Sequence, residues 1–363
     1  MTKPKTIGKG TVDFKQEFAS SKATNAQMIN NRKIINGDDD GLMQVYPLKH
    51  PEAMTIFKAQ LANTWMPEEV EMTRDIEQWN KKGHLTDRER TLFKRCLAFA
   101  SNLDGILTDS LVTNVSRHVT SPEVRLVLAR QGFEEALHVL SYAVMIEALS
   151  MDSEEIYGMY RQDKVLYEKN RHVLESLGKI AHPDFKTGTF SGDQTFLEAC
   201  VTYQILEGVY FFIVFLLFYI LKRNNKMPGS AEMIQFINRD EDLHVRIFSF
   251  MINTIKKDQP ELWTKEFQDK MASHFKSSAE LEISWGIHCM GDGVLGLNPV
   301  NIRQYIEFIA NTRMQAIGLP PAYKARANPF PWIDEMTQGS MIETNFFEGR
   351  VREYASGTLT WDE

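Results

Sequence analysis

Proline is sparse through the central part of the chain, and this spacing restricts the possible folds more than any other sequence feature. Between residues 68 and 319 the only prolines are Pro122, Pro183, Pro228, Pro260 and Pro299. Because proline ends or kinks a helix, the long intervals between these positions are free to form extended helices. A β-sandwich or β-barrel would need turn residues every 8–12 positions or so, and that pattern is absent. The sequence therefore predicts an all-α protein.

Composition excludes several broad classes of protein. Of the 363 residues, 43% are hydrophobic and 25% are charged, which is ordinary for a globular chain and excludes wholesale disorder. The formal net charge of −7 gives the chain no general reason to bind nucleic acid or an anionic membrane. We therefore expect neither nucleic acid nor membrane as a partner.

The cysteines and the first forty residues indicate the compartment. Cys96, Cys200 and Cys289 are an odd number without a C-x-x-C motif, which suits buried thiols in a reducing environment. The first forty residues lack the apolar core of a secretory signal. The apolar run VYFFIVFLLFYIL at 209–221 is shorter than the roughly 20 residues that a membrane span needs. These features predict a cytoplasmic protein in which this run is a core helix.

Three regions are expected along the chain. Residues 1–45 show little periodicity and end near an acidic turn at 36–41, which predicts a flexible N-terminal arm. Residues 46–325 are expected to form the helical domain. One clear helix start is Ser121-Pro122-Glu123, which combines an N-cap residue, a proline at the first helical position and an acid in the first turn. Residues 326–363 are expected to form an irregular segment and a tail.

Two Glu-x-x-His motifs indicate a metal site. They are Glu135 with His138, and Glu241 with His244. Residues at i and i+3 of a helix project from one face, so a carboxylate oxygen and an imidazole nitrogen can bind the same ion. Each motif lies on a stripe of helical spacing that is otherwise largely apolar, which favours burial of both pairs.

Two further helices carry a single acid on an apolar stripe, Asp104 and Glu207. A buried carboxylate without a partner costs several kcal/mol or takes up a proton. Any one of these acids could instead cap a helix or pair across an interface. For the whole set, however, no lysine or arginine lies nearby on those stripes. Two divalent ions bound by four carboxylates and two imidazoles would balance the charge, which is the ferritin-like dimetal-carboxylate arrangement.

Tyr142 lies one helical turn beyond His138 on the same face, within several ångströms of any metal bound there. A buried tyrosine usually fills the core and hydrogen-bonds through its hydroxyl. Beside an oxidised metal pair it can instead lose an electron and become a radical. The residues alone leave both roles open.

Motifs spread over most of the chain resemble one family, the small, radical-generating subunit of class I ribonucleotide reductase. The motifs are WMPEEVEMTRDIEQW, SNLDGIL, FEEALHVLSY, YQILEGVYFF, NRDEDLH, NTRMQAIGL and NPFPW. The resemblance implies a ferritin-like bundle with additional helices. The metal ligands that it implies are Asp104, Glu135, His138, Glu207, Glu241 and His244.

The resemblance also implies roles for residues around this site. Tyr142 would carry a radical, with Phe211, Phe215 and Ile237 as apolar neighbours. A relay of electron and proton transfer would run from the metals through His138, Asp240 and Trp65 towards Tyr354, and Glu348 would be the family's tail glutamate. From the residues alone, Trp65 could be core, Asp240 could cap a helix or pair with Arg239, and Tyr354 could be an exposed tail residue.

Branches of the family differ in their metals. The motif spacing and the tail NFFEGRVREYASGTLTW resemble a branch that has phenylalanine at the radical position and a mixed Mn/Fe centre. This chain has Tyr142 there, and Asp104 where that branch has glutamate. A related group with those residues uses two manganese ions. We therefore expect a dinuclear centre, with Mn/Mn preferred, Fe/Fe second and Mn/Fe third. The ligand types do not decide between these pairs, because carboxylate and imidazole ligands suit both metals.

The sequence lacks two parts that a complete reductase would need. It has no glycine-rich nucleotide loop and no cysteine pair to act as reductant. We therefore expect a separate large catalytic subunit, which the polar C-terminal tail would bind. The resemblance implies that this subunit reduces ribonucleoside diphosphates and that the helical body forms a homodimer.

Two other functions remain open. A ferritin-like dimetal oxidase acting alone on a hydrophobic ligand would share the six ligands but would have no use for a relay. An iron-storage or purely structural bundle would be non-enzymatic.

Overall fold

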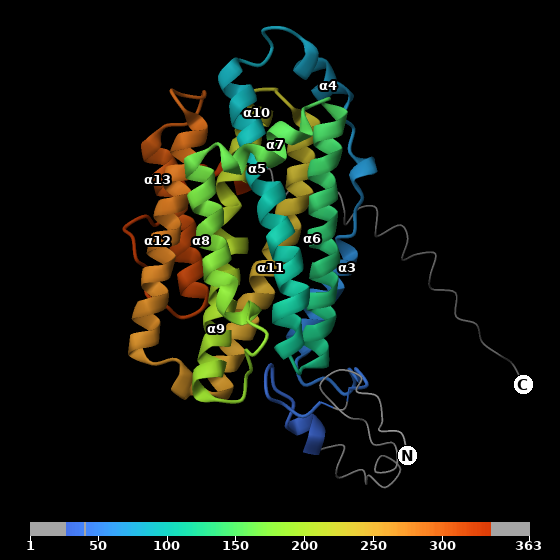
Figure 1. The fold of residues 1–363 in the computed structure, drawn as a ribbon, viewed down its shortest axis with the longest axis vertical. Coiled ribbons are helices and arrows are strands. Elements are labelled where there is room, and N and C mark those ends of the chain that lie inside the picture. Colours follow the sequence, from blue (N-terminus) through green and yellow to red (C-terminus); the bar gives the residue numbers. More distant parts are fainter. Residues whose placement is uncertain (1–26, 40, 335–363) are drawn as a thin grey trace, which may run out of the picture.

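The computed structural model describes residues 27–39 and 41–334, and helices dominate these ranges (Figure 1). The main helices are α3 (Pro51–Ala62), α4 (Thr73–Asn80), α5 (Asp87–Ser110), α6 (Pro122–Ala148), α7 (Ser153–Gly158), α8 (Lys164–Ala181), α9 (Phe190–Ile205), α10 (Phe212–Arg223), α11 (Pro228–Asp258), α12 (Lys265–Met290) and α13 (Pro299–Ala316). Four short 3₁₀ turns join them: η1 (Pro67–Glu69), η3 (Ser116–His118), η4 (Met159–Arg161) and η6 (Pro260–Leu262). Two π-helical turns, η2 (Leu111–Val115) and η5 (Leu206–Tyr210), follow α5 and α9. The described ranges contain one isolated β-bridge, between Ile35 and Val119, and no strand, so the all-α prediction is confirmed.

Local sequence signals explain where the long helices begin. At the start of α6 the Ser121 hydroxyl accepts a hydrogen bond from the Val124 amide, and Pro122 occupies the first turn. This is the start predicted from the sequence. At the start of α5, Thr86 and Glu89 form a reciprocal capping box.

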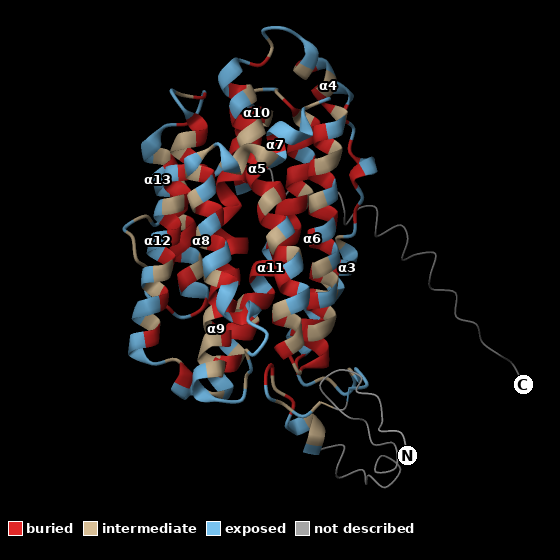
Figure 2. Cartoon of the chain, viewed as in Figure 1, coloured by how far each residue is buried: buried red, intermediate tan, exposed pale blue. Residues whose placement is uncertain are grey.

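Long helices from distant parts of the sequence form the centre of the bundle. Helix α5 packs on α6, α6 packs on α11, and α11 packs on α9 and α10. Figure 1 shows α3 beside α6, with α8, α12 and α13 covering the other side of the bundle. The buried residues lie on the helix faces that point into the bundle, and the exposed residues lie on the outer faces (Figure 2).

The most apolar part of the chain lies inside the bundle, as predicted. Residues Phe190–Arg223 follow one continuous helical path through α9, η5 and α10. By length and composition this path could span a membrane, but its most apolar window is wholly buried within the protein. The path differs from the predicted regular helix because η5 inserts a π turn into it. The apolar residues of this run occupy every face of the helix, so their spacing gives no signal for the insertion.

Part of the expected N-terminal arm packs against the bundle. Ile34 and Ile35 are buried, and the Thr120 amide donates a hydrogen bond to the Ile34 carbonyl at 2.8 Å. At the other end, Phe330 is buried against Tyr305 with 5.5 Å between ring centroids. The tail residues Glu348 and Tyr354 lie outside the described residues, so the roles expected of them stay predictions.

Candidate metal centre

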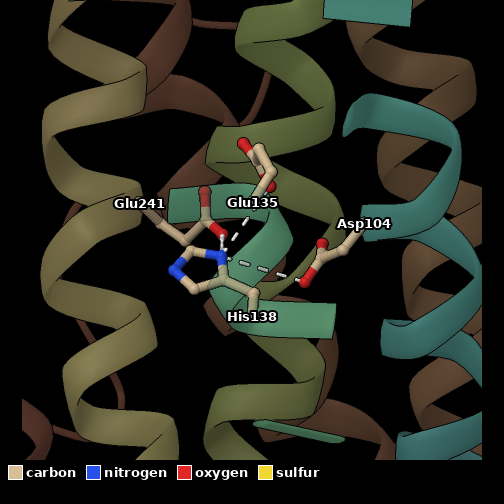
Figure 3. Close-up of side chains that lie close together, drawn as sticks. All are labelled: Asp104, Glu135, His138 and Glu241. Carbon is tan, nitrogen blue, oxygen red and sulfur yellow. Dashed lines mark ion pairs between the residues drawn. The ribbon is translucent and has the colours of Figure 1, made fainter. Parts of the chain in front are cut away.

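The six residues that burial and charge selected lie together in the middle of the bundle. Four elements carry them: α5 supplies Asp104, α6 supplies Glu135 and His138, η5 supplies Glu207, and α11 supplies Glu241 and His244. None of the six has measurable solvent exposure. Figure 3 shows Asp104, Glu135, His138 and Glu241 pointing toward one another from three helices.

These side chains form two overlapping ligand groups. The first group is Asp104, Glu135, His138 and Glu241, and the second is Glu135, Glu207, Glu241 and His244. Within each group the ligand atoms all lie within 4.8 Å of one another. Glu135 and Glu241 belong to both groups. The geometry suits a dinuclear centre with one histidine on each ion.

Several polar atoms of the cluster have no hydrogen-bond partner among the described residues. They are both carboxylate oxygens of Asp104, Glu135 Oε2, His138 Nδ1, Glu207 Oε2 and Glu241 Oε1. Buried polar atoms are nearly always paired, and leaving one unpaired costs about 1–3 kcal/mol. All of these atoms belong to the two ligand groups, so the residues present fit a pair of divalent cations.

The cluster raises the pKa of two of its acids and of both histidines, but the physical causes differ. Burial, followed by the charge of Glu135, raises the pKa of Asp104 and of Glu207 well above the usual value. Burial alone would lower the pKa of His138 and His244, but the surrounding carboxylates raise it well above the usual value. Without a metal, the cluster therefore favours protonated imidazoles and two protonated carboxylic acids.

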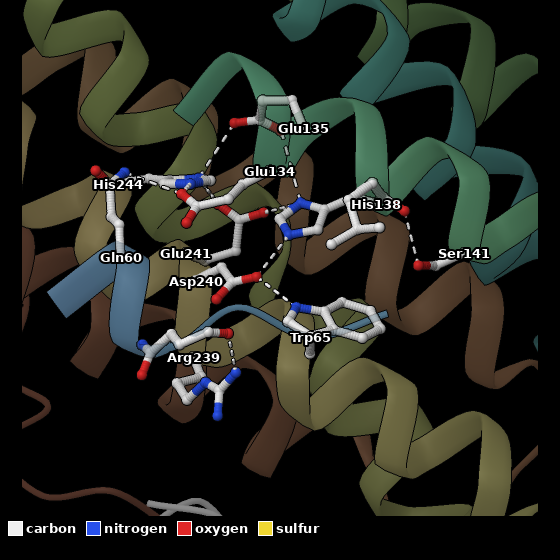
Figure 4. Close-up of polar contacts among 12 residues, drawn as sticks. Gln60, Trp65, Glu134, Glu135, His138, Ser141, Arg239, Asp240, Glu241 and His244 are labelled. Carbon is white, nitrogen blue, oxygen red and sulfur yellow. Dashed lines mark hydrogen bonds and ion pairs between the residues drawn. The ribbon is translucent and has the colours of Figure 1, made fainter. Parts of the chain in front are cut away.

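Each histidine also contacts a second carboxylate on the side away from the cluster. His138 Nε2 lies 3.3 Å from Asp240 Oδ2, and His244 Nε2 lies 3.0 Å from Glu134 Oε2 (Figure 4). Both carboxylates therefore turn the Nδ1 atoms toward the ligand groups. A carboxylate in this position orients a metal-binding histidine and increases its basicity.

Glu134 was not selected from the sequence. It is fully buried, and it accepts hydrogen bonds from Gln60 at 2.9 Å and from Arg130 at 3.0 Å. A signal was available, because an acid precedes each Glu-x-x-His motif, Glu134 in one and Asp240 in the other. The structure pairs them crosswise, so that each acid contacts the histidine of the other helix.

Gln131, one turn before Glu135, was also missed. Its side-chain amide donates to Glu135 at 3.2 Å and to Glu207 at 2.9 Å. It thereby links carboxylates from α6 and η5 and limits their rotation.

Trp65 and Asp240 form a connected path with the cluster. The Trp65 indole Nε1 donates to Asp240 Oδ2 at 2.7 Å, the same oxygen that contacts His138. Trp65 is 2% exposed and stacks on Phe236 with 5.2 Å between ring centroids. The structure therefore brings together the three inner residues that were expected to form a relay (Figure 4).

Tyr142 lies in the same enclosed region. It is fully buried, and its hydroxyl has no hydrogen-bond partner among the described residues. Burial, followed by the charge of Asp104, raises the pKa of the phenol well above its usual value. Phe211, Phe215 and Ile237 are also buried, and the two phenylalanine rings stack at 5.9 Å.

Comparison with known proteins identifies the family. Residues 42–329 match the family described as "Ribonucleotide reductase, small chain". The chain belongs to the ribonucleotide reductase small chain family. It is 34% identical to the ribonucleoside-diphosphate reductase subunit beta of Chlamydia pneumoniae, over 92% of this chain and 96% of that protein. It is 31% identical to the subunit beta of Halalkalibacterium halodurans, over 94% and 95% of the two chains.

Solved structures of the small chain family have the same fold. The ribonucleotide reductase R2 subunit of Clostridium botulinum superposes with a TM-score of 0.78 at 31% identity, covering 84% of this chain and 94% of that one. The dimanganese(II)-NrdF of Streptococcus sanguinis superposes with a TM-score of 0.66 at 19% identity, over 77% and 92% of the two chains. These likenesses confirm the ferritin-like helical bundle that was predicted from the sequence.

Proposed function

We propose that this chain is the small, beta subunit of a ribonucleoside-diphosphate reductase. In this role it generates and holds a one-electron oxidant and passes it to a separate catalytic subunit. The observation that carries the proposal is the juxtaposition of two overlapping ligand groups with the Trp65–Asp240–His138 path in one dry interior. Membership of the small chain family, whose relatives are named as beta subunits, supports it.

The residues that would hold the dinuclear centre are Asp104, Glu135, His138, Glu207, Glu241 and His244. When bound, this centre supplies one-electron oxidising power through its higher oxidation states. We prefer Mn/Mn over Fe/Fe, with Mn/Fe third, on the combination of Tyr142 with Asp104 in this sequence. The ligand set suits all three pairs.

The relay residues have distinct tasks. When the Trp65 indole gives up an electron, its Nε1 proton can move to Asp240 Oδ2, which lies 2.7 Å away. Because His138 Nε2 contacts the same oxygen, Asp240 couples the indole to the ligand shell. Tyr142 would store the oxidant as a radical, and Tyr354 in the tail would continue the path to the catalytic subunit.

Burial protects this chemistry. None of the six ligands is exposed, and Tyr142 is fully buried, so bulk water and stray reductants are kept from the oxidised groups. Transfer to another protein therefore has to proceed through connected side chains. This requirement favours a two-subunit reductase over a ferritin-like oxidase acting alone on a hydrophobic ligand, which would have no use for the Trp65 contact.

The proposal also covers the binding partners of the protein and the compartment in which it acts. The large catalytic subunit would bind the C-terminal tail, including Glu348 and Tyr354, and two copies of the helical body would form a homodimer. We further propose that the protein acts in the cytoplasm, in keeping with its three free cysteines.

The test compares the metal-loaded protein with Trp65→Phe and Tyr142→Phe variants, with and without a catalytic subunit. Diphosphate reduction is expected only in the presence of the second subunit, and Trp65→Phe should lower it about 100-fold or more with the metal content unchanged.

Low-temperature EPR of Tyr142→Phe decides where the oxidant is stored. Loss of an organic radical indicates the tyrosine, whereas an unchanged manganese signal with retained activity indicates the metals. Full activity of Trp65→Phe, or activity of the isolated chain on a hydrophobic ligand, would overturn the proposal.

A further inference from the structure

The π turn η5, which carries Glu207, has unusual backbone contacts. In an α-helix each amide donates to the carbonyl four residues earlier, and a π insertion breaks this pattern over about one turn. Backbone groups near the break then need other partners, because buried amides and carbonyls are rarely left unpaired.

Three charged side chains from three other helices supply partners to this turn. Lys169 Nζ on α8 donates to the Tyr210 carbonyl at 3.4 Å, Glu282 Oε1 on α12 accepts from the Ile213 amide at 3.2 Å, and Arg313 Nε on α13 donates to the Gly208 carbonyl at 3.2 Å. All three contacts fall within six residues of Glu207. We call Lys169, Glu282 and Arg313 the cradle.

Two members of the cradle form a buried ion pair. Lys169 is 1% exposed, Glu282 is fully buried, and Lys169 Nζ contacts Glu282 Oε2 directly. The ammonium also lies 3.4 Å from the centre of the Phe99 ring. Desolvating two charges is so costly that a buried ion pair is often no more stabilising than apolar residues of the same volume. Stability is therefore a poor explanation for this pair, whereas its contacts with the π turn provide a specific one.

The third member approaches the turn closely because Gly208 has no side chain. A Cβ atom at Gly208 would lie 3.0 Å from Arg313 Nε and 3.1 Å from Val245 Cγ2. Val245 follows the candidate ligand His244, so any displacement here would reach α11 as well. Arg313 is also 3.7 Å from Asp242, which keeps its guanidinium over the turn.

The register of this turn determines where Glu207 points. Each residue of an α-helix rotates the side-chain direction by about 100°, so removing the one-residue insertion would turn Glu207 away from its partners. In the observed register Glu207 Oε1 accepts from Gln131 at 2.9 Å, and Glu207 Oε2 lies 4.0 Å from His244 Nδ1.

We propose that Lys169, Glu282 and Arg313 are positioning residues that hold η5 in its π register and thereby keep the Glu207 carboxylate in the second ligand group. This inference rests on the proposed dinuclear centre. It predicts an effect confined to one ion, because Glu207 belongs to the group with His244 and not to the group with Asp104.

The decisive variant is Lys169→Met/Glu282→Gln in the full-length, metal-free protein. Glutamine keeps an oxygen that can accept from the Ile213 amide, while the double change removes both charges together and leaves no unpaired ion. Titration with Mn²⁺ is followed by EPR, which distinguishes an isolated ion from a magnetically coupled pair. The wild type is expected to take up two ions per chain. The variant should bind one ion with unchanged affinity and the second at least about tenfold more weakly, with the signal of an isolated ion over the intermediate range.

A matched control removes a different ion pair. Lys226→Met/Glu89→Gln disrupts a partly buried pair at the start of α5 that has no contact with η5, and both ions should bind as in the wild type. If the decisive double variant does not fold, Arg313→Met takes its place, because it removes the contact with the Gly208 carbonyl and leaves only the exposed Asp242 without this partner, with the same expected loss at one site. Two ions bound with wild-type affinities in a folded cradle variant would overturn this inference alone. Failure of the wild type to bind two ions would overturn the proposed function as well.

Discussion

Each histidine of the candidate metal centre lies between carboxylates on both sides, and this arrangement favours protonation of the site in the metal-free protein. His244 Nδ1 lies 3.0 Å from Glu241 Oε2 and 3.1 Å from Glu135 Oε1, while Nε2 faces Glu134. The raised pKa values of both histidines, and of Asp104 and Glu207, mean that protons balance the charge when no metal is present. Metal ions and protons therefore compete for the same buried atoms.

Metal binding should accordingly release protons. The raised pKa of both imidazoles and of the Asp104 and Glu207 carboxyl groups favours their protonated forms in the metal-free protein, so we expect a net release of protons when two divalent ions bind near neutral pH. Because the pKa of each of these four groups is raised, the affinity for Mn²⁺ should increase as the pH rises. The measurement is calorimetry of Mn²⁺ binding in buffers of different ionisation enthalpy. Binding without proton release, or an affinity independent of pH between 6 and 8, would contradict the charge balance described here.

The clustering of the six candidate ligands could be predicted because their signal is local. An acid or a Glu-x-x-His pair on an apolar helical stripe is rarely left without a compensating charge. For Glu134 the sequence shows an acid before the motif but does not show which histidine it contacts. It lies beside Glu135 in the chain, but its partner His244 is on another helix, so its role depends on how α6 and α11 face each other. Gln131 is similar, because it contributes through Glu207 on a third element.

At the scale of elements, the π turn and its cradle were beyond prediction from the sequence. The run around η5 is apolar on every face, so it carries no periodicity that could reveal an inserted residue. Lys169 is one of several charged residues in α8, and nothing local distinguishes the one that points inward. Its role becomes visible only when α8 and α12 bring it against Glu282.

The packing of α8 against α12 also places two histidine rings next to each other, with an angle of 45° between their planes. The ring centroids of His172 and His274 lie 5.6 Å apart, and His274 Nε2 is 3.3 Å from the Thr202 hydroxyl of α9. Burial, followed by the charge of His172, lowers the pKa of His274 to about 4. Both rings are therefore neutral at physiological pH, and acid would charge a pair that is held together by packing.

This pair should make the helical body sensitive to acid. The folded pKa of His274 lies below the usual 6.5, so the unfolded chain takes up the proton first. The free energy of unfolding is then unaffected above about pH 6.5 and falls as the pH drops towards 4, by at most about 3 kcal/mol from this residue. His274→Gln, which keeps a partner for Thr202, should reduce the drop in melting temperature between pH 7 and pH 5. His182→Gln, at an exposed histidine, is the control and should behave as the wild type. Equal acid sensitivity of His274→Gln and wild type would refute the explanation.

For the whole molecule, the described residues contain every candidate ligand and the inner relay, whereas the outer relay residues lie beyond them. Asp104 is the first ligand along the chain and His244 the last, and Trp65 precedes both. Proline spacing was enough to predict an all-α chain, but not which helices adjoin, because each long helix offers more than one apolar stripe. The arrangement of the helices around the candidate ligands was therefore inferred from the resemblance of the motifs to a known family, and not from periodicity.

The candidate metal ligands lie in the helical body and the proposed docking residues lie in the tail, so metal binding and subunit docking can be tested separately. Removal of all residues after 345 takes away Glu348 and Tyr354 but none of the candidate ligands, so metal uptake and its EPR signal should remain as in the full-length protein. Ribonucleotide reduction by the mixture with the catalytic subunit should fall to background, because both the proposed docking segment and the proposed outer relay residue are missing. Tyr354→Phe in the full-length chain separates these two losses: it should bind the catalytic subunit with wild-type affinity, measured by surface plasmon resonance, yet support no turnover. Activity of the truncated chain would show that the oxidant leaves the bundle by another route, and weak binding of Tyr354→Phe would assign the tyrosine to docking instead of transfer.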